Sequence, residues 1–334
     1  MRIPFFLLVL LLPFLSPAQY DKLLQHKDIL WAAEAKVLVS FEPQTEANIP
    51  GFLEAIPVKL MQEENFNPSP SPVTQGLIEL MEAGRWPAFA DAGLTQPLSR
   101  EAARAQMAQV DTIITFDPET YEEKMMVVRN EMLGSTSVFA IRQLWYYNGR
   151  TDNLESLVLA IAPTWDGGDT EADYRPLAWF KVPAAEKKLF KLESKAVPYA
   201  TFLKLDLSER DLTVLKGADR PLKAILFDHV KSGRINSYDG AGQAIPPAQV
   251  PTLFSSVDTI ITFDPETYEE TIEVVQWDFN PEDVGNYRLK QTLFFDPRQG
   301  KLQCRPEAVA PTIAITDEYG QLKYFQPLFY WKRE

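Results

Sequence analysis

The chain has 334 residues, with 33 lysines and arginines against 46 aspartates and glutamates, and a formal net charge of −13. This acidic balance argues against nucleic acid or an anionic membrane surface as the ligand. Hydrophobic residues make up 46% of the chain and aromatic residues 12%. That is enough to fill two cores, and the length by itself predicts roughly two domains.

The N-terminal stretch 1–18 has the pattern of a signal peptide. Arg2 gives it a positive start, residues 5–15 form an apolar run interrupted by Pro13, and small residues at 16–18 precede Gln19. The run is too short to span a bilayer. Cys304 is the only cysteine, so an intrachain disulfide is impossible and no cysteine follows the cleavage site to carry a lipid. We therefore expect an exported protein whose attachment to a membrane comes through a partner.

Residues 19–73 are predicted to form an N-terminal segment that ends in a Pro-rich linker. Apolar residues between Ile29 and Phe41 predict a helix that runs into a strand. Prolines at 68, 70 and 72 predict an extended stretch with a hinge. A helix should follow, with Thr74 as its N-cap and Gly84 just beyond its last turn.

The fourteen residues VDTIITFDPETYEE occur twice, at 110–123 and at 257–270. An identity of this length cannot arise from composition, so we interpret the chain as an internal duplication. The β-branched and aromatic residues favour a strand, and the Asp-Pro that follows ends this strand in a turn. A second β-rich segment comes after each copy, which predicts a hairpin or a pair of strands in each half.

The match between the two halves extends beyond this repeat. Gly84-Arg85 follows the first predicted helix, and Gly233-Arg234 follows a second one at 222–232. Three strand-like stretches of the first half have counterparts in the second: 141–147 with 289–295, 161–164 with 309–312, and 175–181 with 326–332. The first half alone is expected to insert a helix capped by Ser99.

These correspondences predict an α+β fold of two tandem modules, 74–183 and 222–334. Each module is expected to be a helix plus a mostly antiparallel sheet of about five strands. A charged and partly helical connector is predicted at 184–221. The two modules are expected to touch only weakly.

Few residues stand in patterns that indicate catalysis. His26 and His229 lack the spacing of metal ligands, and His229 is expected to be solvated or at the edge of a core. Cys304 lies on a predicted strand with no motif around it. An aromatic cluster could form a sugar-binding platform, but alternation of side chains along a strand favours core packing. Its members are Trp145, Tyr146, Tyr147 and Trp179.

Two alternatives to a structural role remain open. Repeated carboxylates could supply the acid and base of a carbohydrate-active enzyme if two of them met in an apolar pocket. These are Asp117, Glu119, Glu122 and Glu123, repeated as Asp264, Glu266, Glu269 and Glu270. The acidic loop 166–173 could bind calcium in an adhesion module, although it lacks the EF-hand spacing. Solvated turns are the simpler interpretation of both patterns, so no cofactor or metal is predicted.

The run of motifs resembles the GldN (PorN) family of gliding-motility and type IX secretion proteins. The resemblance rests on DTIITFDPETYEE, on VVRNE at 127–131, and on IRQLWYY, IAP and RPLAWF in that order. It covers about 77–181 well, 29–41 weakly, and the second copy less fully. A second module that continues almost to residue 334 departs from the family pattern.

This resemblance implies a non-enzymatic periplasmic subunit. Such a subunit assembles with an outer-membrane lipoprotein, GldK (PorK), into a ring beneath the outer membrane. Exposed strand edges and aromatic surfaces suit the contacts of such an assembly. We therefore expect the two repeated turns to contact partners, through Asp117, Glu119, Tyr121, Asp264, Glu266 and Tyr268.

Overall fold

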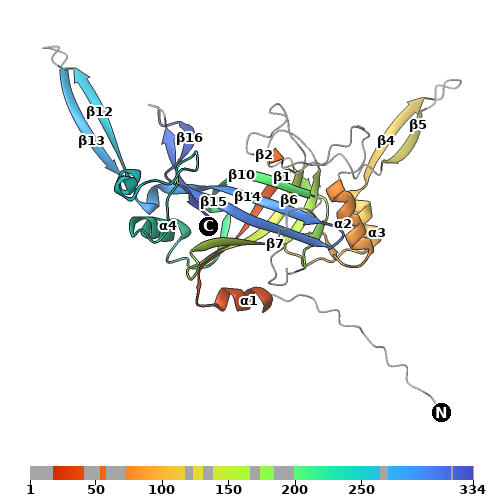
Figure 1. Ribbon diagram of the computed structural model, residues 1–334. Coiled ribbons are helices and arrows are strands. Elements are labelled where there is room, and N and C mark those ends of the chain that lie inside the picture. The colour runs from red at the N-terminus through yellow and green to blue at the C-terminus, as the bar shows by residue number, and fades with distance from the viewer. Residues whose placement is uncertain are drawn as a thin grey trace.

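The protein is built mainly of antiparallel strands, as a computed structural model shows (Figure 1). The structure describes residues 18–40, 53–57, 72–116, 123–130, 138–165, 174–183, 199–263, 270–316 and 319–333. Most strands belong to two sheets, and the remaining four form two separate hairpins. The predicted Pro-rich linker lies largely outside the described residues.

The first sheet has seven strands, in the order β11-β1-β6-β7-β9-β3, with β8 paired to β7. Its central strand β6 (Val138–Asn148) is rich in β-branched and aromatic residues and is buried along almost its whole length. Its other strands are β1 (Ile29–Ser40), β3 (Ala88–Phe89), β7 (Asn153–Trp165), β8 (Arg175–Pro176), β9 (Trp179–Lys181) and β11 (Leu212–Lys216).

The second sheet has six strands, in the order β16-β15-β14-β10-β2, with β17 paired to β15. Its strands are β2 (Leu53–Pro57), β10 (Tyr199–Ser208), β14 (Val284–Asp296), β15 (Lys301–Thr316), β16 (Leu322–Pro327) and β17 (Trp331–Lys332). An early segment of the chain, β2, therefore completes the later sheet, while β11 from the middle of the chain pairs with β1.

The two sheets share a central arrangement. In the first, β6 lies between β1 and β7; in the second, β14 lies between β10 and β15. A register shift interrupts β6 between Arg142 and Gln143, and a matching shift interrupts β14 between Lys290 and Gln291. The strands that pair with β6 and β14 from earlier in the chain, β1 and β10, precede the helices at which the two predicted modules begin. Each sheet thus draws on residues ahead of 74 or 222.

Local sequence signals predict three of the four α-helices in the described residues, and the first of the four was not predicted. The helices are α1 (Ala18–Gln25), α2 (Pro72–Glu82), α3 (Arg100–Met107) and α4 (Leu222–Lys231). Gly84 and Gly233 follow α2 and α4 with φ of 69° and 70°, a conformation that glycine adopts without steric penalty. Ser99 caps α3, as predicted, by accepting a hydrogen bond from the amide of Ala102 at 3.1 Å. The helix expected to start at Thr74 begins earlier, at Pro72.

One secondary-structure prediction is wrong. Residues 29–40 form one strand and no helix, because pairing to β6 and β11 outweighs the helical preference of the alanines in this stretch. The described part of the predicted connector, 199–221, forms β10, a short 3-10 turn (Glu209–Asp211) and β11. The rest of the connector, 184–198, lies outside the described residues.

The two sheets pack face to face, with β7 against β15. A single cluster of buried apolar residues joins Trp145 and Phe180 of the first sheet to Leu289 and Phe295 of the second. The ring of Trp86 meets that of Phe295 edge to face at 6.1 Å. The prediction of weak contact is therefore wrong. Each sheet turns its larger apolar face to the other sheet, while Leu23 and Leu24 of α1 pack against a smaller apolar cluster on the first sheet that includes Leu144 and Tyr146.

Reciprocal arginine contacts fasten the two halves together. After α2, Arg85 donates to the carbonyl oxygen of Arg298 at 2.9 Å and to that of Gln299, both in the β14–β15 turn. After α4, Arg234 donates to the carbonyl oxygen of Gly149 and, at 2.9 Å, to Asp152 in the β6–β7 turn. The Gly-Arg pair after each helix thus directs an arginine to the corresponding turn of the other half.

Candidate interaction arms

Two β-hairpins extend from opposite ends of the packed sheets (Figure 1). The first arm consists of β4 (Gln109–Phe116) and β5 (Glu123–Asn130). The second arm consists of β12 (Ser255–Phe263) and β13 (Glu270–Asp278). The described residues of the two repeats, 110–116 with 123 and 257–263 with 270, lie in these arms, and the predicted pair of strands in each copy is confirmed.

The two arms have the same register. Val110 pairs with Arg129 in the first arm, and Val257 pairs with Gln276 in the second. The pair at the far end of each hairpin is Phe116 with Glu123 and Phe263 with Glu270. Equivalent positions on both strands thus differ by 147 residues along the whole hairpin, as they do in the sequence. Identical residues have folded into the same local structure twice.

Each arm is a sheet of only two strands. In the part of the chain that the structure describes, β4 pairs only with β5 and β12 only with β13. An isolated two-stranded hairpin is marginally stable in water. Its outer edges also present backbone amide and carbonyl groups to which another strand can pair. The arms are therefore suited to receive a partner.

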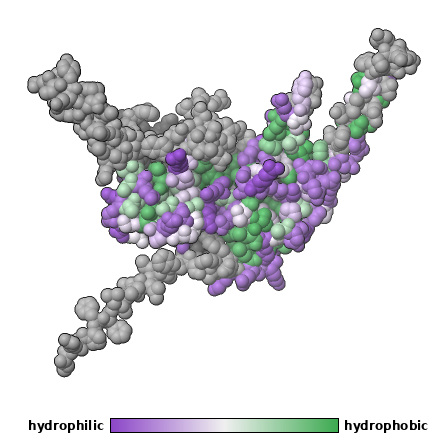
Figure 2. Space-filling view, turned by 180° about the vertical axis from the view of Figure 1, so that it is seen from behind, coloured by the Kyte–Doolittle hydropathy of each residue, from purple (hydrophilic) through white to green (hydrophobic). Residues whose placement is uncertain are grey.

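The second arm has an exposed apolar face. Val257 and Ile261 on β12 are 64% and 52% exposed, and Ile272 and Val274 on β13 are 61% and 65% exposed. Ile261 lies opposite Ile272 and Val274 lies opposite Thr259, so the four side chains share one face of the hairpin. Figure 2 shows this apolar surface on the arm at the upper right. Contiguous exposed apolar surface marks an interaction site.

The six predicted contact residues lie outside the described residues. They are Asp117, Glu119, Tyr121, Asp264, Glu266 and Tyr268. The exposed apolar positions of the second arm were not predicted as contact residues. Val257 and Ile261 are part of the repeat itself, and the alternation of apolar residues there could have indicated an apolar face. Sequence patterns do not show, however, that this hairpin extends away from the two sheets.

Comparison with protein families agrees with this structural repetition. A model of the family described as "Gliding motility associated protein GldN" matches residues 52–202 and again residues 199–332. The chain belongs to the GldN family. No curated protein matches it. The second GldN match begins at the residue where β10 begins, so it includes a strand that precedes α4.

A groove lies at the root of the second arm of this GldN-family chain. It has a volume of about 810 Å³ and lies between the end of α4, the 3-10 segment Pro247–Phe254 and the start of the arm. Val230, Phe254 and Phe279 contribute apolar surface to it. The ammonium of Lys231 lies 4.6 Å from the centroid of the Phe254 ring, within the range of a cation–π contact. Asp278 also lines the groove, so the root of the arm combines apolar surface with one charge of each sign.

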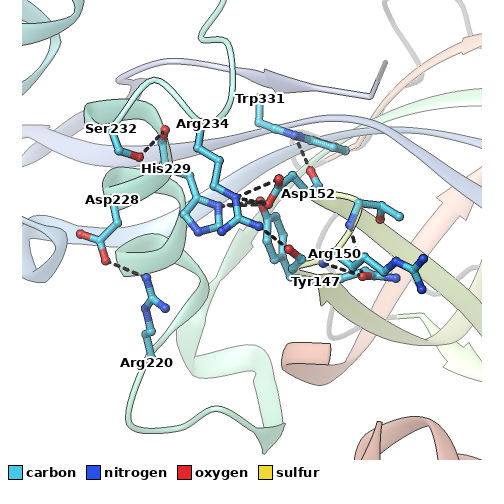
Figure 3. Close-up of polar contacts among 12 residues, drawn as sticks. Tyr147, Arg150, Asp152, Arg220, Asp228, His229, Ser232, Arg234 and Trp331 are labelled. Carbon is cyan, nitrogen blue, oxygen red and sulfur yellow. Dashed lines mark hydrogen bonds and ion pairs between the residues drawn. The ribbon is translucent and has the colours of Figure 1, made fainter. Parts of the chain in front are cut away.

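The principal cluster of titratable side chains lies elsewhere, between the two halves (Figure 3). The hydroxyl of Tyr147 on β6 lies 2.9 Å from Nδ1 of His229 on α4 and donates to Asp152 at 3.3 Å. Arg234 also bonds to Asp152, and the indole of Trp331 donates to the Asp152 carbonyl oxygen at 3.1 Å. His229 is 5% exposed, which excludes the predicted solvated position.

Electrostatics in this cluster favours a structural role. Burial lowers the pKa of His229, and the positive charge of Arg234 lowers it further, against the opposing effect of Asp152. Burial and the neighbouring Asp152 raise the pKa of Tyr147 far above its ordinary value. Tyr147 is therefore a protonated donor and His229 a neutral partner at pH 7. Neither of these two residues lines the groove at the root of the second arm.

Other residues singled out in the sequence also lie in the core. The four aromatic residues, Trp145, Tyr146, Tyr147 and Trp179, are all buried, which confirms core packing and excludes an open sugar platform. Burial raises the pKa of the Cys304 thiol well above its ordinary value, so this side chain stays protonated and is a poor nucleophile.

The described part of the chain contains neither a cluster of side chains that could hold a metal ion nor a helix that could cross a membrane. The acidic loop 166–173 lies outside that part. Within it, no group of three or more His, Cys, Asp or Glu side chains is placed to hold a metal ion. None of its helices is both long and apolar enough to cross a membrane.

Proposed function

We propose that this GldN-family chain is a non-enzymatic assembly subunit of the gliding-motility and type IX secretion machinery. In this proposal it resides in the periplasm, binds an outer-membrane lipoprotein of the GldK type, and forms part of an oligomeric ring. One observation carries the proposal. The longest stretch of sequence that the two halves share belongs to two arms that extend away from the core formed by the two sheets. Residues kept identical there serve contacts outside the molecule.

We further infer that the chain consists of two copies of one structural unit, a helix followed by an antiparallel sheet. The two family matches, the matching register shifts in β6 and β14, and the Gly-Arg pair after α2 and α4 support this. The sequence predicts modules at 74–183 and 222–334. Pairing of β1 with β6 and of β10 with β14 supports units that also include these earlier strands.

Partner binding can be tested with the purified mature chain, residues 19–334, and a lipid-free GldK-type lipoprotein. Size-exclusion chromatography with light scattering should show a complex of the two proteins. Replacing the exposed Ile272 and Val274 of the second arm by serine should weaken this complex at least about tenfold, because apolar area is lost from the contact. The matched control replaces Val214 and Leu215 on β11, which are 44% and 41% exposed, by serine.

The control variant should bind the lipoprotein as the wild type does. A mature chain that remains a monomer and captures no lipoprotein would contradict the proposed function. So would a result in which the β11 control loses binding and the arm variant keeps it. No described residue supports the carbohydrate-active enzyme or the calcium-dependent adhesion module over this proposal.

A further inference from the structure

We propose that the exposed face of the second arm binds an amphipathic helix of a partner protein, and that this helix carries a lysine or arginine at each end of its apolar stripe. This inference rests on the assembly role proposed above and names the kind of partner segment that the arm takes. It is carried by the side chains on one face of the arm, by the charges at the two ends of that face, and by the dimensions of the hairpin.

The middle of this face is an apolar strip. Ile261 lies opposite Ile272, Thr259 lies opposite Val274, and Val257 follows on β12 toward the root of the arm. Residues directly opposite each other in an antiparallel pair point to the same face, and so do residues two apart along a strand. All five side chains are exposed. They therefore form one continuous strip that the chain itself does not cover.

An acidic residue lies at each end of the strip. Glu270 lies opposite Phe263 at the far end of the hairpin, and Asp278 lies opposite Ser255 at its root. The same alternation puts both acids on the face of the strip, and both are exposed. Strands β12 and β13 contain no lysine or arginine, so the strands of the arm supply no cation to these acids. A partner that is apolar in the middle and basic at both ends therefore matches the face along its length.

The face continues into the groove at the root of the arm. Ser255, Gln276 and Asp278 belong to the face and also line the groove. Phe254 adds apolar surface there, and its ring holds the ammonium of Lys231 at 4.6 Å from its centroid. Because Lys231 already has this aromatic partner, Asp278 is the charge at the root that needs a partner from outside.

The dimensions of the arm favour a helix as the occupant. Neighbouring strands lie about 4.8 Å apart, so a face of two strands is roughly 10 Å wide, and an α-helix with its side chains is about 10–12 Å across. Glu270 and Asp278 are eight residues apart, which is roughly 27 Å of strand and about 18 residues of helix. A strand added to an edge of the arm would extend the face without covering it. The first sheet already shows a helix on an apolar cluster, through Leu23 and Leu24 of α1.

Charge argues against a second copy of an arm as the occupant. Residues 255–278 contain seven acidic residues and no basic one, and residues 109–130 contain five acidic residues and two basic ones. Both arms therefore have a net negative charge, and placing either of them on the face of the second arm would bring like charges together. An anionic lipid surface is disfavoured for the same reason. The occupant is therefore a partly basic segment of another protein.

Designed peptides test the charge and the helix. The probe is an 18-residue peptide with leucine at every third or fourth position and two lysines in each terminal turn, and the control peptide has glutamate in place of each lysine. The mature chain, residues 19–334, should bind the lysine peptide at least about tenfold more tightly. Salt should reduce this difference, because it screens exposed charges. A lysine peptide with a central proline, which breaks a helix, should lose binding. Fluorescence anisotropy measures each affinity.

Charge reversal on the arm should reverse the choice of peptide. With Glu270→Lys and Asp278→Lys together, the chain should prefer the glutamate peptide, because each end of the face then attracts an acid. The matched control is Asp211→Lys with Asp219→Lys, which makes the same change in net charge at exposed positions outside the arm. It should keep the wild-type preference. Thermal unfolding of each variant should match the wild type, which checks folding.

Two further variants test the apolar strip. Ile261→Ser with Ile272→Ser should weaken binding of the lysine peptide at least about tenfold, because apolar area is lost from the contact. Val274→Cys, labelled with a thiol-reactive photocrosslinker, should capture the lysine peptide, whereas Leu215→Cys on β11 should not. The natural cysteine, Cys304, is buried and should take up little label.

Four results would overturn the inference. They are equal affinity for the lysine and glutamate peptides, a preference that charge reversal on the arm leaves unchanged, undiminished binding after loss of the two isoleucines, and equal capture from positions 274 and 215. Tight binding of the proline peptide would overturn the helix as the form of the partner.

The same variants separate this inference from the proposed function. A charge-reversed arm that prefers the glutamate peptide and binds the GldK-type lipoprotein at least about tenfold more weakly supports both. A chain that binds the lipoprotein but neither peptide removes the helix and leaves the assembly role. A chain that selects the lysine peptide but captures no lipoprotein removes the lipoprotein partner and leaves the helix-binding face.

Discussion

The two packed sheets and their helices form the body of this protein and bury their large apolar residues, whereas the second arm exposes such residues. In the body, residues such as Trp145 and Phe295 are completely buried between two sheets. In the second arm, Ile272 and Val274 are more than half exposed, at 61% and 65%. Yet the sequence is most strictly repeated in the arms, while the two helices have diverged so far that Leu80 of α2 corresponds to His229 of α4.

This difference shows what the repeat preserves. Core packing tolerates exchange of one apolar residue for another when volume and pattern are kept, and the body shows such exchanges between its halves. The arms have little core to maintain, so folding alone does not explain fourteen identical residues there. A function at the surface of the arms explains them. Substitutions in each region can test whether a residue contributes to the stability of the body or to contacts made by an arm.

The largest effect is expected in the body. Phe295→Ala removes a ring with 0% exposure that packs against Trp86 at the contact between the halves. The free energy of unfolding should fall by about 3–5 kcal/mol, as for other buried phenylalanines. Urea denaturation measures this. Ile272→Ala on the second arm is the matched control and should change stability by less than about 0.5 kcal/mol. A similar decrease in the free energy of unfolding in both variants would contradict the distinction between body and arm.

A backbone effect should come next. Gly233 has φ of 70°, and no neighbouring atom lies within 4 Å of the position that an alanine methyl group would occupy, so Gly233→Ala introduces only backbone strain. We expect a loss of about 1–2 kcal/mol. Gly285 on β14 has equally open surroundings without a positive φ, and Gly285→Ala should leave stability unchanged or raise it by up to about 1 kcal/mol. Thermal denaturation distinguishes the two, and equal effects would contradict a role for Gly233 in ending α4.

A pH effect should follow from the contact between the halves. Burial lowers the pKa of His229 in the folded protein, whereas in the unfolded chain it is about 6.5. Below about pH 6.5 the unfolded chain therefore binds a proton that the folded chain does not, so stability is present above this pH and falls as the pH decreases toward the folded pKa. Asp152, Arg234, Arg220 and Asp228 are the charged groups that influence this pKa.

The variant His229→Leu tests this effect, because leucine is the residue at the matching position, Leu80. Denaturation midpoints measured at about pH 7.5 and about pH 5.5, on either side of the unfolded pKa, should differ less for the variant than for the wild type. An unchanged difference would show that other groups account for the pH dependence, and that His229 does not link the two halves electrostatically.

The smallest effect on stability is expected at the arm surface. Val257→Thr keeps the β-branched shape of a side chain that is 64% exposed, so unfolding should shift by less than about 0.5 kcal/mol. The same change should reduce self-association or partner binding measured by light scattering, because it removes apolar surface from the arm. If the variant is as stable as the wild type and also associates as the wild type does, Val257 contributes neither to the stability of the fold nor to the contact.

The sequence alone determined the features that depend on neighbouring residues. Two identical stretches gave two hairpins of one register, Gly84 and Gly233 ended their helices, and Ser99 capped α3, because turns and caps involve a few consecutive residues. Pairing and packing over long distances were decided only by the tertiary structure. It made residues 29–40 a strand, placed β2 and β10 in one sheet, and buried both halves in one core. It also left the arms outside that core, since whether a hairpin is covered depends on surfaces that come from distant parts of the chain.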